Sequence, residues 1–223
     1  MRPLDGFGGV GLETIANRTL AWVPDLARTA GDGDLPSVVA PTPATPPGIQ
    51  RRPLAILAAD IVGYCRLIEL DELETALRVR HLRRYLIEPA ALAHRGRVAD
   101  LAGDGTLLAF QRAADAVACA VALQRRLGAL ERDAPADRPI RLRIGISADE
   151  VLVVDGDLYG RAVNVAARLE ALAGPGDVYL SEAALTRAGE RIAVRCEPLG
   201  ERRLRNIAEP VRVYRVARSE LAA

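Results

Sequence analysis

The chain has little of what several protein classes require. Its 223 residues include only three cysteines, Cys65, Cys119 and Cys196, which are far apart and form no CxxC pair. Its two histidines, His81 and His94, have no metal-ligand spacing with each other or with a cysteine. Neither a disulfide framework nor a zinc site is therefore expected, and reduced thiols fit a cytoplasmic protein.

An excess of charge of one sign and a long apolar run are also missing. The formal net charge is +1, and acidic residues are interleaved with the arginines, so we expect no general attraction to nucleic acid or anionic lipid. No apolar run approaches the roughly 20 residues of a membrane helix, and the N-terminus lacks the apolar core of a secretory signal. Aromatic residues make up 4% of a chain that is 50% hydrophobic, so aliphatic residues must form the core.

Composition divides the chain into four parts. Residues 31–53 are dense in Gly, Pro, Ser and Thr and are predicted to be a linker. Within the preceding segment, 1–30, residues 11–28 could form one short amphipathic helix or be disordered. Residues 54–217 carry the patterning of a folded domain, and 218–223 form a tail.

The order of elements in the domain predicts an α+β fold. The apolar run at 54–64 is typical of a buried strand, and residues 70–94 have the leucine and alanine spacing of a long helix. Two strand-like runs then flank the hairpin signal at 103–105. With a helix at 113–133 and a strand at 140–147, the start reads βαββαβ, a ferredoxin-like sheet with helices packed on it. The remaining runs predict a partner strand at 150–155, helices at 160–174 and after Ser181, and further strands at 178–181, 192–199 and 210–217.

Two carboxylates are the first candidates for chemistry. Asp60 ends the apolar strand, where an unpaired acid is costly to bury. Asp104 lies between Gly103 and Gly105, which permit close approach of a ligand or backbone. If the two strands are neighbours, both acids project from one edge and suit Mg²⁺ or Mn²⁺ with a bound triphosphate. Alternatively, Asp60 caps the following turn and Asp104 is an ordinary hairpin residue.

Asn164 and Arg168 are the second candidates. At a spacing of four they share one helical face, and the small apolar residues between them let the helix lie close to a ligand. A carboxamide and a guanidinium suit charge that develops on a phosphoryl group. Alternatively, they belong to a surface network such as Arg168 with Glu170.

Taken together and in order, three motifs carry a resemblance. LAILAADIVGYCRL, AGDGTLLAF and DLYGRAVNVAARLEAL, followed by GERRLRNIAEPVRVYRV, resemble the class III adenylate/guanylate cyclase catalytic domain, particularly a bacterial branch that reads AADxxGYxRL. The similarity covers most of residues 54–217. It implies conversion of a purine nucleoside triphosphate, ATP or else GTP, to the 3′,5′-cyclic monophosphate and pyrophosphate.

The resemblance also implies roles for single residues. Two Mg²⁺ or Mn²⁺ ions per site would be held by Asp60, Asp104 and the backbone carbonyl of Ile61. The positions that would contact the phosphates, near a helix N-terminus that favours anions, are Val62, Gly63, Tyr64 and Gly103.

Asn164 and Arg168 would stabilise the transition state while the ribose 3′-hydroxyl attacks the α-phosphorus. In the family these two residues come from the other subunit, so the resemblance implies a head-to-tail homodimer with two symmetric sites. Arg205 is the nearest match to a further cation that binds the triphosphate.

Two departures from the family pattern concern substrate choice and activity. Asp100 stands where adenylate cyclases have a lysine that donates to adenine N1, while Asp157 fits the usual partner position. An ionised acid at Asp100 can accept from guanine, but Asp157 has no hydrogen for guanine O6. Asp149 replaces the second glycine of the family's GIHxG. The alternatives are therefore a guanylate cyclase or a catalytically impaired protein that binds a nucleotide or a partner. A metal-dependent phosphohydrolase is disfavoured because no nucleophile or base cluster is present.

Overall fold

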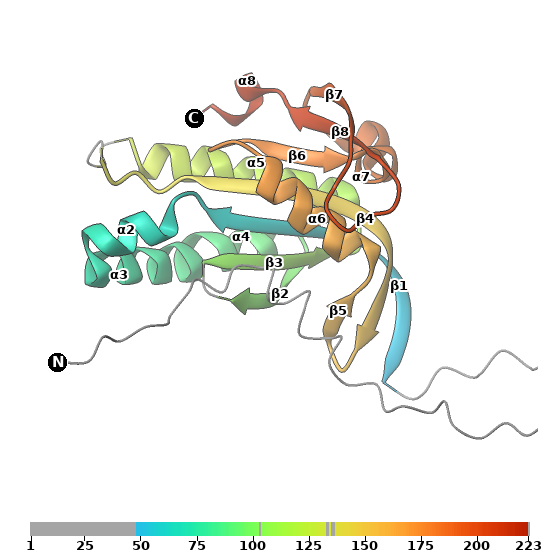
Figure 1. The fold of residues 1–223 in the computed structure, drawn as a ribbon, viewed down its shortest axis with the longest axis horizontal. Helices are drawn as coiled ribbons and strands as arrows, with labels where there is room; N and C mark the ends of the chain where they lie inside the picture. The colour runs from blue at the N-terminus through green and yellow to red at the C-terminus, as the bar shows by residue number, and fades with distance from the viewer. Residues whose placement is uncertain (1–47, 103, 133, 135–136, 223) are drawn as a thin grey trace, which may run out of the picture.

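The computed structural model describes residues 48–222 apart from 103, 133 and 135–136. One eight-stranded sheet has the order β2-β3-β1-β4-β6-β8-β7, with β5 paired to β4 (Figure 1). The strands are β1 (Ile49–Ile61), β2 (Gly96–Ala102), β3 (Gly105–Phe110), β4 (Leu142–Val154), β5 (Asp157–Tyr159), β6 (Val178–Ser181), β7 (Cys196–Arg202) and β8 (Val211–Val216). The helices are α2 (Tyr64–Leu70), α3 (Glu72–Leu82), the π-helix η2 (Arg83–Ile87), α4 (Glu88–Ala93), α5 (Ala113–Leu130), α6 (Arg161–Leu172), α7 (Glu182–Ala188), the 3₁₀-helix η3 (Gly189–Arg191) and α8 (Arg218–Leu221). In this part of the chain, no helix has the length and apolar character needed to cross a bilayer.

The first four long strands form the predicted ferredoxin-like arrangement. β1 is antiparallel to both β3 and β4, and β2 is antiparallel to β3. Helices α2 to α4 connect β1 to β2, and α5 connects β3 to β4. The α+β class and the extra C-terminal strands are thus confirmed, since β6, β8 and β7 extend the sheet beyond β4.

From Ala55 to Ile61, strand β1 is buried on both faces, which explains its continuous apolar run. Leu57 and Ala59 belong to the core shared with α5, whereas Ile56 and Ala58 pack with residues of α6. Figure 1 shows α6 lying across one face of the sheet, with α3, α4 and α5 on the other. Because side chains alternate along a strand, Asp60 falls on the α6 face.

Gly145 of β4 allows α6 to lie directly on the sheet. A Cβ at this position would lie 2.2 Å from both the Ala166 oxygen and the Glu170 nitrogen, which are backbone atoms that cannot move aside. We expect Gly145→Ala to lower the free energy of unfolding by about 3 kcal/mol or more, measured by urea denaturation. Gly156→Ala is the control, because nothing lies within 4 Å of its added Cβ and only its positive φ should cost about 1 kcal/mol. Equal losses would contradict this explanation of the packing.

Several predicted boundaries were wrong, including the strand predicted at 192–199, which is β7 at Cys196–Arg202. β1 begins at Ile49, so the last five residues of the predicted linker belong to the strand. The pairing of β1 with β3 ends where Ala55 lies opposite Phe110, so the residues before Ala55 pair only with β4. Pro53 is tolerated there because one side of the strand needs no hydrogen-bond donor. The runs at 140–147 and 150–155 form one strand, β4, whose short partner is β5. The predicted tail contains α8, which buries Leu221.

The predicted long helix of residues 70–94 is divided into three segments. Asp71 has extended backbone, which ends α2. It also caps the N-terminus of α3, because its carboxylate accepts a hydrogen bond from the Glu74 amide at 2.9 Å. A π-helical turn then separates α3 from α4. The predicted N-terminal segment and most of the predicted linker, residues 1–47, lie outside the described residues.

Candidate functional site

The carboxyl groups of Asp60 and Asp104 meet at one edge of the sheet. β1 runs past the last residue pair it forms with β3, Ala59 with Thr106, so Asp60 faces the turn that carries Asp104. Burial raises the pKa of Asp104 to about 6, and the charge of the neighbouring Asp60 acts in the same direction. The structure therefore brings together the two acids that the sequence singled out.

Arg143 is the charged partner of Asp60, and it is a residue that sequence reasoning missed. It lies opposite Asp60 in the β1–β4 register, and its Nη2 and Nε donate to Asp60 Oδ2 at 2.6 and 3.1 Å. Asp60 is only 8% exposed, so this pairing is what makes its burial tolerable. The alternative in which Asp60 caps a turn is not what the structure has.

Glu170 adds a third acid beside the same guanidinium. Its Oε1 lies 2.5 Å from Arg143 Nε, and its side chain is 4% exposed. Burial raises the pKa of Glu170 to about 8, Asp60 acts in the same direction, and Arg143 opposes them. The predicted alternative placed Glu170 in a surface network with Arg168, but Glu170 points inward from α6 towards β4.

The acid pair fits a divalent cation. Its donors are carboxylate oxygens, which Mg²⁺ and Mn²⁺ prefer, and the charge of Asp60 raises the cost of ionising Asp104, which a cation would offset. Ile61 is the last residue of β1, so its carbonyl lies next to Asp60 in the chain. No group of three or more His, Cys, Asp or Glu side chains among the described residues could hold a metal. The remaining ligands would therefore be backbone, water and phosphate oxygens.

The predicted phosphate-contacting turn follows β1. Gly63 has the left-handed φ of 69° and precedes α2, which begins at Tyr64; the first amides of a helix have no intrahelical acceptor. The prediction was wrong for the amide of Val62, because it donates to the Arg141 carbonyl at 2.9 Å. Gly103 lies outside the described residues.

Asn164 and Arg168 point away from the acid pair of their own chain. The buried residues of α6, which include Ala166 and Glu170, face the sheet, whereas Asn164 is exposed. Arg168 Nε donates to the carbonyl of Arg205 at 3.3 Å. The predicted catalytic pair and Arg205 thus form a second group, which one chain alone does not bring to Asp60 and Asp104.

The predicted base-selecting residues lie on two neighbouring elements. Asp100 is on β2 and Asp157 begins β5, and Arg97 Nη2 of β2 donates to the Gly156 carbonyl at 3.1 Å. Asp149 is placed elsewhere than expected. It pairs with Leu54 in the sheet register, six residues before Asp60 and thus roughly 20 Å from it.

Asp149 instead serves a local contact. Its carboxylate accepts from the Glu150 amide at 2.9 Å and lies 3.5 Å from Arg187 of α7. The Asp149 carboxylate is therefore remote from this chain's own acid pair.

Comparisons with known proteins agree with the fold and the motifs. Residues 96–217 match the family described as adenylate and guanylate cyclase catalytic domain. "Putative adenylate cyclase 3" of Rhizobium meliloti is 43% identical over 166 residues, which are 74% of this chain and 28% of that protein. The adenylate cyclase of Streptomyces coelicolor is 32% identical over 150 residues, 67% of this chain and 37% of that protein.

A solved structure is similar over nearly its whole length. The adenylate/guanylate cyclase/hydrolase from Silicibacter pomeroyi is 39% identical, with a TM-score of 0.71 over 75% of this chain and 98% of that chain. By contrast, this chain spans less than half the length of the two curated relatives above.

Proposed function

Because the chain belongs to the adenylate and guanylate cyclase catalytic domain family, we propose that it cyclises a purine nucleoside triphosphate to the 3′,5′-cyclic monophosphate and pyrophosphate. ATP is the substrate we assign first, and GTP is the second candidate. The observation that carries the proposal is the meeting of the Asp60 and Asp104 carboxyl groups at one sheet edge. Two carboxylates there suit the divalent cations that accompany a triphosphate.

The acid pair would hold the reacting end of the nucleotide. Asp60, Asp104 and the Ile61 carbonyl would ligate two Mg²⁺ or Mn²⁺ ions, which when bound lower the pKa of a hydroxyl nucleophile and neutralise phosphate charge. Arg143 fixes the Asp60 carboxylate through two hydrogen bonds. The amides of Gly63 and Tyr64 would contact phosphate oxygens at the start of α2.

A second copy of the chain would supply the residues that stabilise negative charge in the transition state. Arg168 and Asn164 face outward from α6, so a head-to-tail homodimer would bring them to the acid pair of the partner. Arg168 would offset charge on the α-phosphate and Asn164 would orient the ribose, leaving positioning and electrostatics as the main sources of rate. Arg205, hydrogen-bonded to Arg168 through its carbonyl, would reach the same triphosphate.

Purine choice should respond to Asp100. We expect Asp100→Lys to raise kcat/KM for ATP by about tenfold, because a lysine donates to adenine N1 where a carboxylate cannot. Initial rates with ATP and GTP measure the effect, and Asp149→Lys is the control, since it adds the same charge away from the acid pair. An unchanged or lower rate with ATP would show that position 100 does not contact the base.

Product identification tests the proposal as a whole. The full chain is incubated with Mn²⁺ and ATP or GTP, and the products are separated by chromatography. A cyclic nucleotide that Asp104→Ala abolishes is the expected result. Nucleotide binding without any product would favour the impaired, nucleotide-binding alternative, for which Asp100 is the supporting observation.

A further inference from the structure

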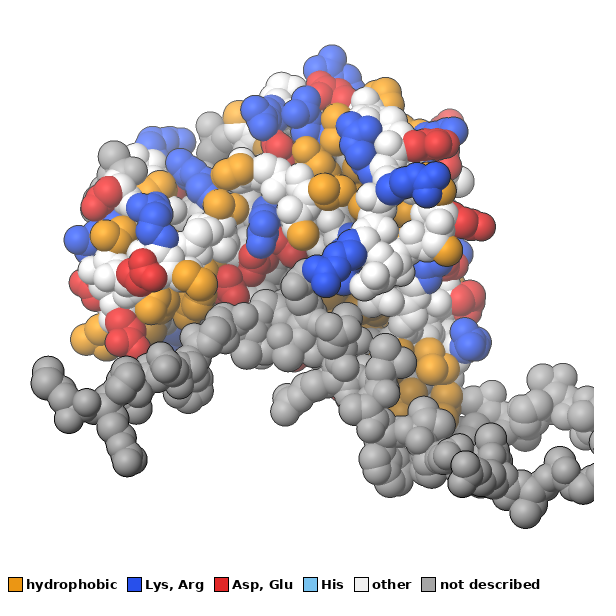
Figure 2. Space-filling view, in the orientation of Figure 1, with side chains coloured by type: hydrophobic (Ala, Val, Ile, Leu, Met, Phe, Trp, Pro, Cys, Tyr) orange, Lys and Arg blue, Asp and Glu red, His pale blue; other side chains and the backbone are white. Residues whose placement is uncertain are grey.

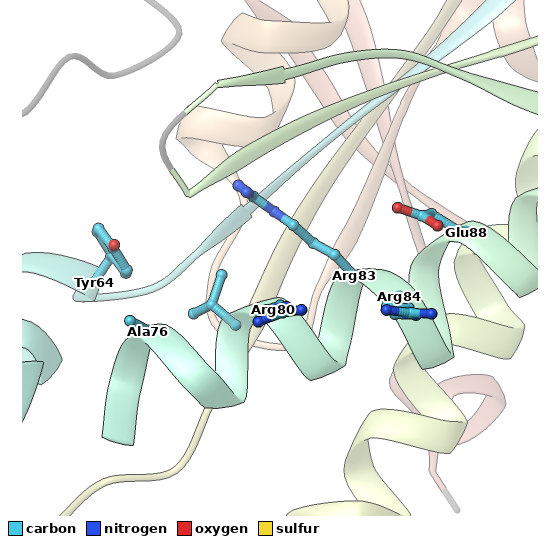
Figure 3. Close-up of a pocket in the computed structure, with 7 residues that line it drawn as sticks. Tyr64, Ala76, Arg80, Arg83, Arg84 and Glu88 are labelled. Carbon is cyan, nitrogen blue, oxygen red and sulfur yellow. The ribbon is translucent and has the colours of Figure 1, made fainter. Parts of the chain in front are cut away.

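A cleft of about 520 Å³ lies between the start of α2 and the helix formed by α3, η2 and α4. Figure 3 shows Tyr64 at one end, Glu88 at the other, and three arginines between them: Arg80, Arg83 and Arg84. Arg83 extends from η2 away from the helix axis, into the region above it in this view. The described lining therefore carries three guanidinium groups and one carboxylate.

The cleft is on the opposite side of the sheet from the acid pair. Val79, which also lines it, belongs to the core cluster of Leu57 and Ala59, whereas Asp60 faces α6. A ligand in the cleft would therefore not occupy the proposed catalytic site. Tyr64 is shared, since its backbone begins α2 while its side chain lines the cleft.

Two of the arginines that line the cleft have no acidic partner in the described part of the chain. Arg80 and Arg84 make no ion pair with any residue that the structure describes, whereas Arg78 on the same helix pairs with Glu131 at 2.7 Å. Arg84 lies 5.7 Å from the ring centre of Tyr85, a contact that leaves its charge uncompensated. On the face in Figure 2, by contrast, basic side chains are interspersed with acidic ones.

A departure from α-helical geometry occurs at the same place. η2 covers Arg83–Ile87, and the Glu88 amide donates to the Arg83 carbonyl five residues earlier. Pro89 explains the wider turn, because it lacks an amide hydrogen and its ring would clash with the Tyr85 carbonyl in a regular helix. Single π-helical turns occur frequently at functional sites.

From these features we propose that the cleft binds a pyrophosphate group, either free or at the end of a nucleoside triphosphate. The planar guanidinium of arginine binds phosphate oxygens in pairs, and the chain contains no lysine that could do so as a point charge. Arg80 and Arg84 supply the uncompensated positive charge, and the Tyr64 hydroxyl adds a donor. The volume lies within the range of small-ligand pockets.

Isothermal titration calorimetry of the full chain with inorganic pyrophosphate, in buffer with a metal chelator, tests this inference. Chelation keeps divalent cations from the acid pair, so the result is independent of the proposed catalytic function. Arg80→Gln with Arg84→Gln should weaken binding at least tenfold, and Arg80→Lys with Arg84→Lys by less. Titration with ATP in parallel distinguishes the two sources of the group. If both ligands bind, the cleft accepts the end of a nucleoside triphosphate. If only pyrophosphate binds, the ligand is the free anion.

The matched control removes the same charge elsewhere. Arg126 and Arg132 are exposed and have no ion pair with a described residue, so Arg126→Gln with Arg132→Gln should bind pyrophosphate as the parent does. Unchanged thermal unfolding of each variant shows that the fold is intact. The inference is overturned if the parent binds no pyrophosphate, or if the Arg80 and Arg84 variants bind it as tightly. It is also overturned if their only effect is on the oligomeric state, since the cleft would then be a contact between copies.

Discussion

Asp104→Ala should lower cyclic nucleotide formation by at least about a thousandfold. The substitution removes one of the two carboxylates proposed to hold the metal ions, and a single carboxylate cannot hold two cations against a triphosphate. Losses of this size are typical when a group that stabilises charge in phosphoryl or acyl transfer is removed. The measurement is the initial rate with Mn²⁺ and ATP, or with GTP if that is the better substrate.

Asp115→Ala is a suitable control for this prediction. Asp115 is an acid in the first turn of α5, 3.5 Å from Arg95 and remote from Asp60 in the fold, so its loss should change the rate less than twofold. If Asp104→Ala retained more than about a tenth of the parental rate with an intact fold, the acid pair could not be the metal site.

Arg168→Ala is expected to have the second largest effect, a loss of about a hundredfold to a thousandfold in kcat with a smaller change in KM. An arginine that meets charge developing only in the transition state affects kcat more than substrate binding. Its neighbour on the outward face of α6, Arg161, is the control. Arg161 lies 3.9 Å from an exposed Glu209, so Arg161→Ala should leave kcat within about twofold, as for other exposed ion pairs.

Mixing the two inactive variants tests where Arg168 acts. Because Arg168 points away from Asp60 of its own chain, a mixed dimer of Asp104→Ala and Arg168→Ala would contain one intact site. Random exchange makes half of the dimers mixed, so activity should recover to about a quarter of the parental value. No recovery, although light scattering shows exchanged dimers, would place Arg168 and Asp104 in the same chain's site or would remove Arg168 from catalysis.

Much of the fold was predictable because its signals are local. The apolar run at Leu57, the glycine-flanked turn at Asp104 and the patterned helix of Asn164 each indicate one element. The neighbouring positions of β1 and β3 then follow from the ferredoxin-like order. What could not be predicted depends on partners far apart in sequence. Pro53 forms part of a strand because only one side of β1 is paired there.

The candidate site was predictable to a similar degree. The acid pair could be inferred because both residues stand at strand ends, but Arg143 and Glu170 could not. Arg143 reads as an ordinary polar position in an alternating strand, and only the antiparallel register places it opposite Asp60. Glu170 reads as a surface acid two residues after Arg168, and only the contact of α6 with Gly145 shows that it is buried.

Helix α6 therefore contributes one residue to its own chain's acid pair and another to its outward face. From α6, Glu170 contacts the arginine that fixes Asp60 within the chain, while Arg168, two residues earlier, faces outward. In the proposed dimer, a displacement of α6 would alter the acid pair of one site and the transition-state arginine of the other. This arrangement explains why substitutions that disturb the packing at Gly145 should affect both stability and turnover.

The most direct measurement of the central claim is an anomalous difference map from crystals that contain Mn²⁺ and 3′-deoxy-ATP, which has no 3′-hydroxyl and cannot cyclise. We predict density for two Mn²⁺ ions within ligand distance of both the Asp60 and Asp104 carboxylates, with the triphosphate beside Gly63. Bound nucleotide with no Mn²⁺ between these two side chains would contradict the account.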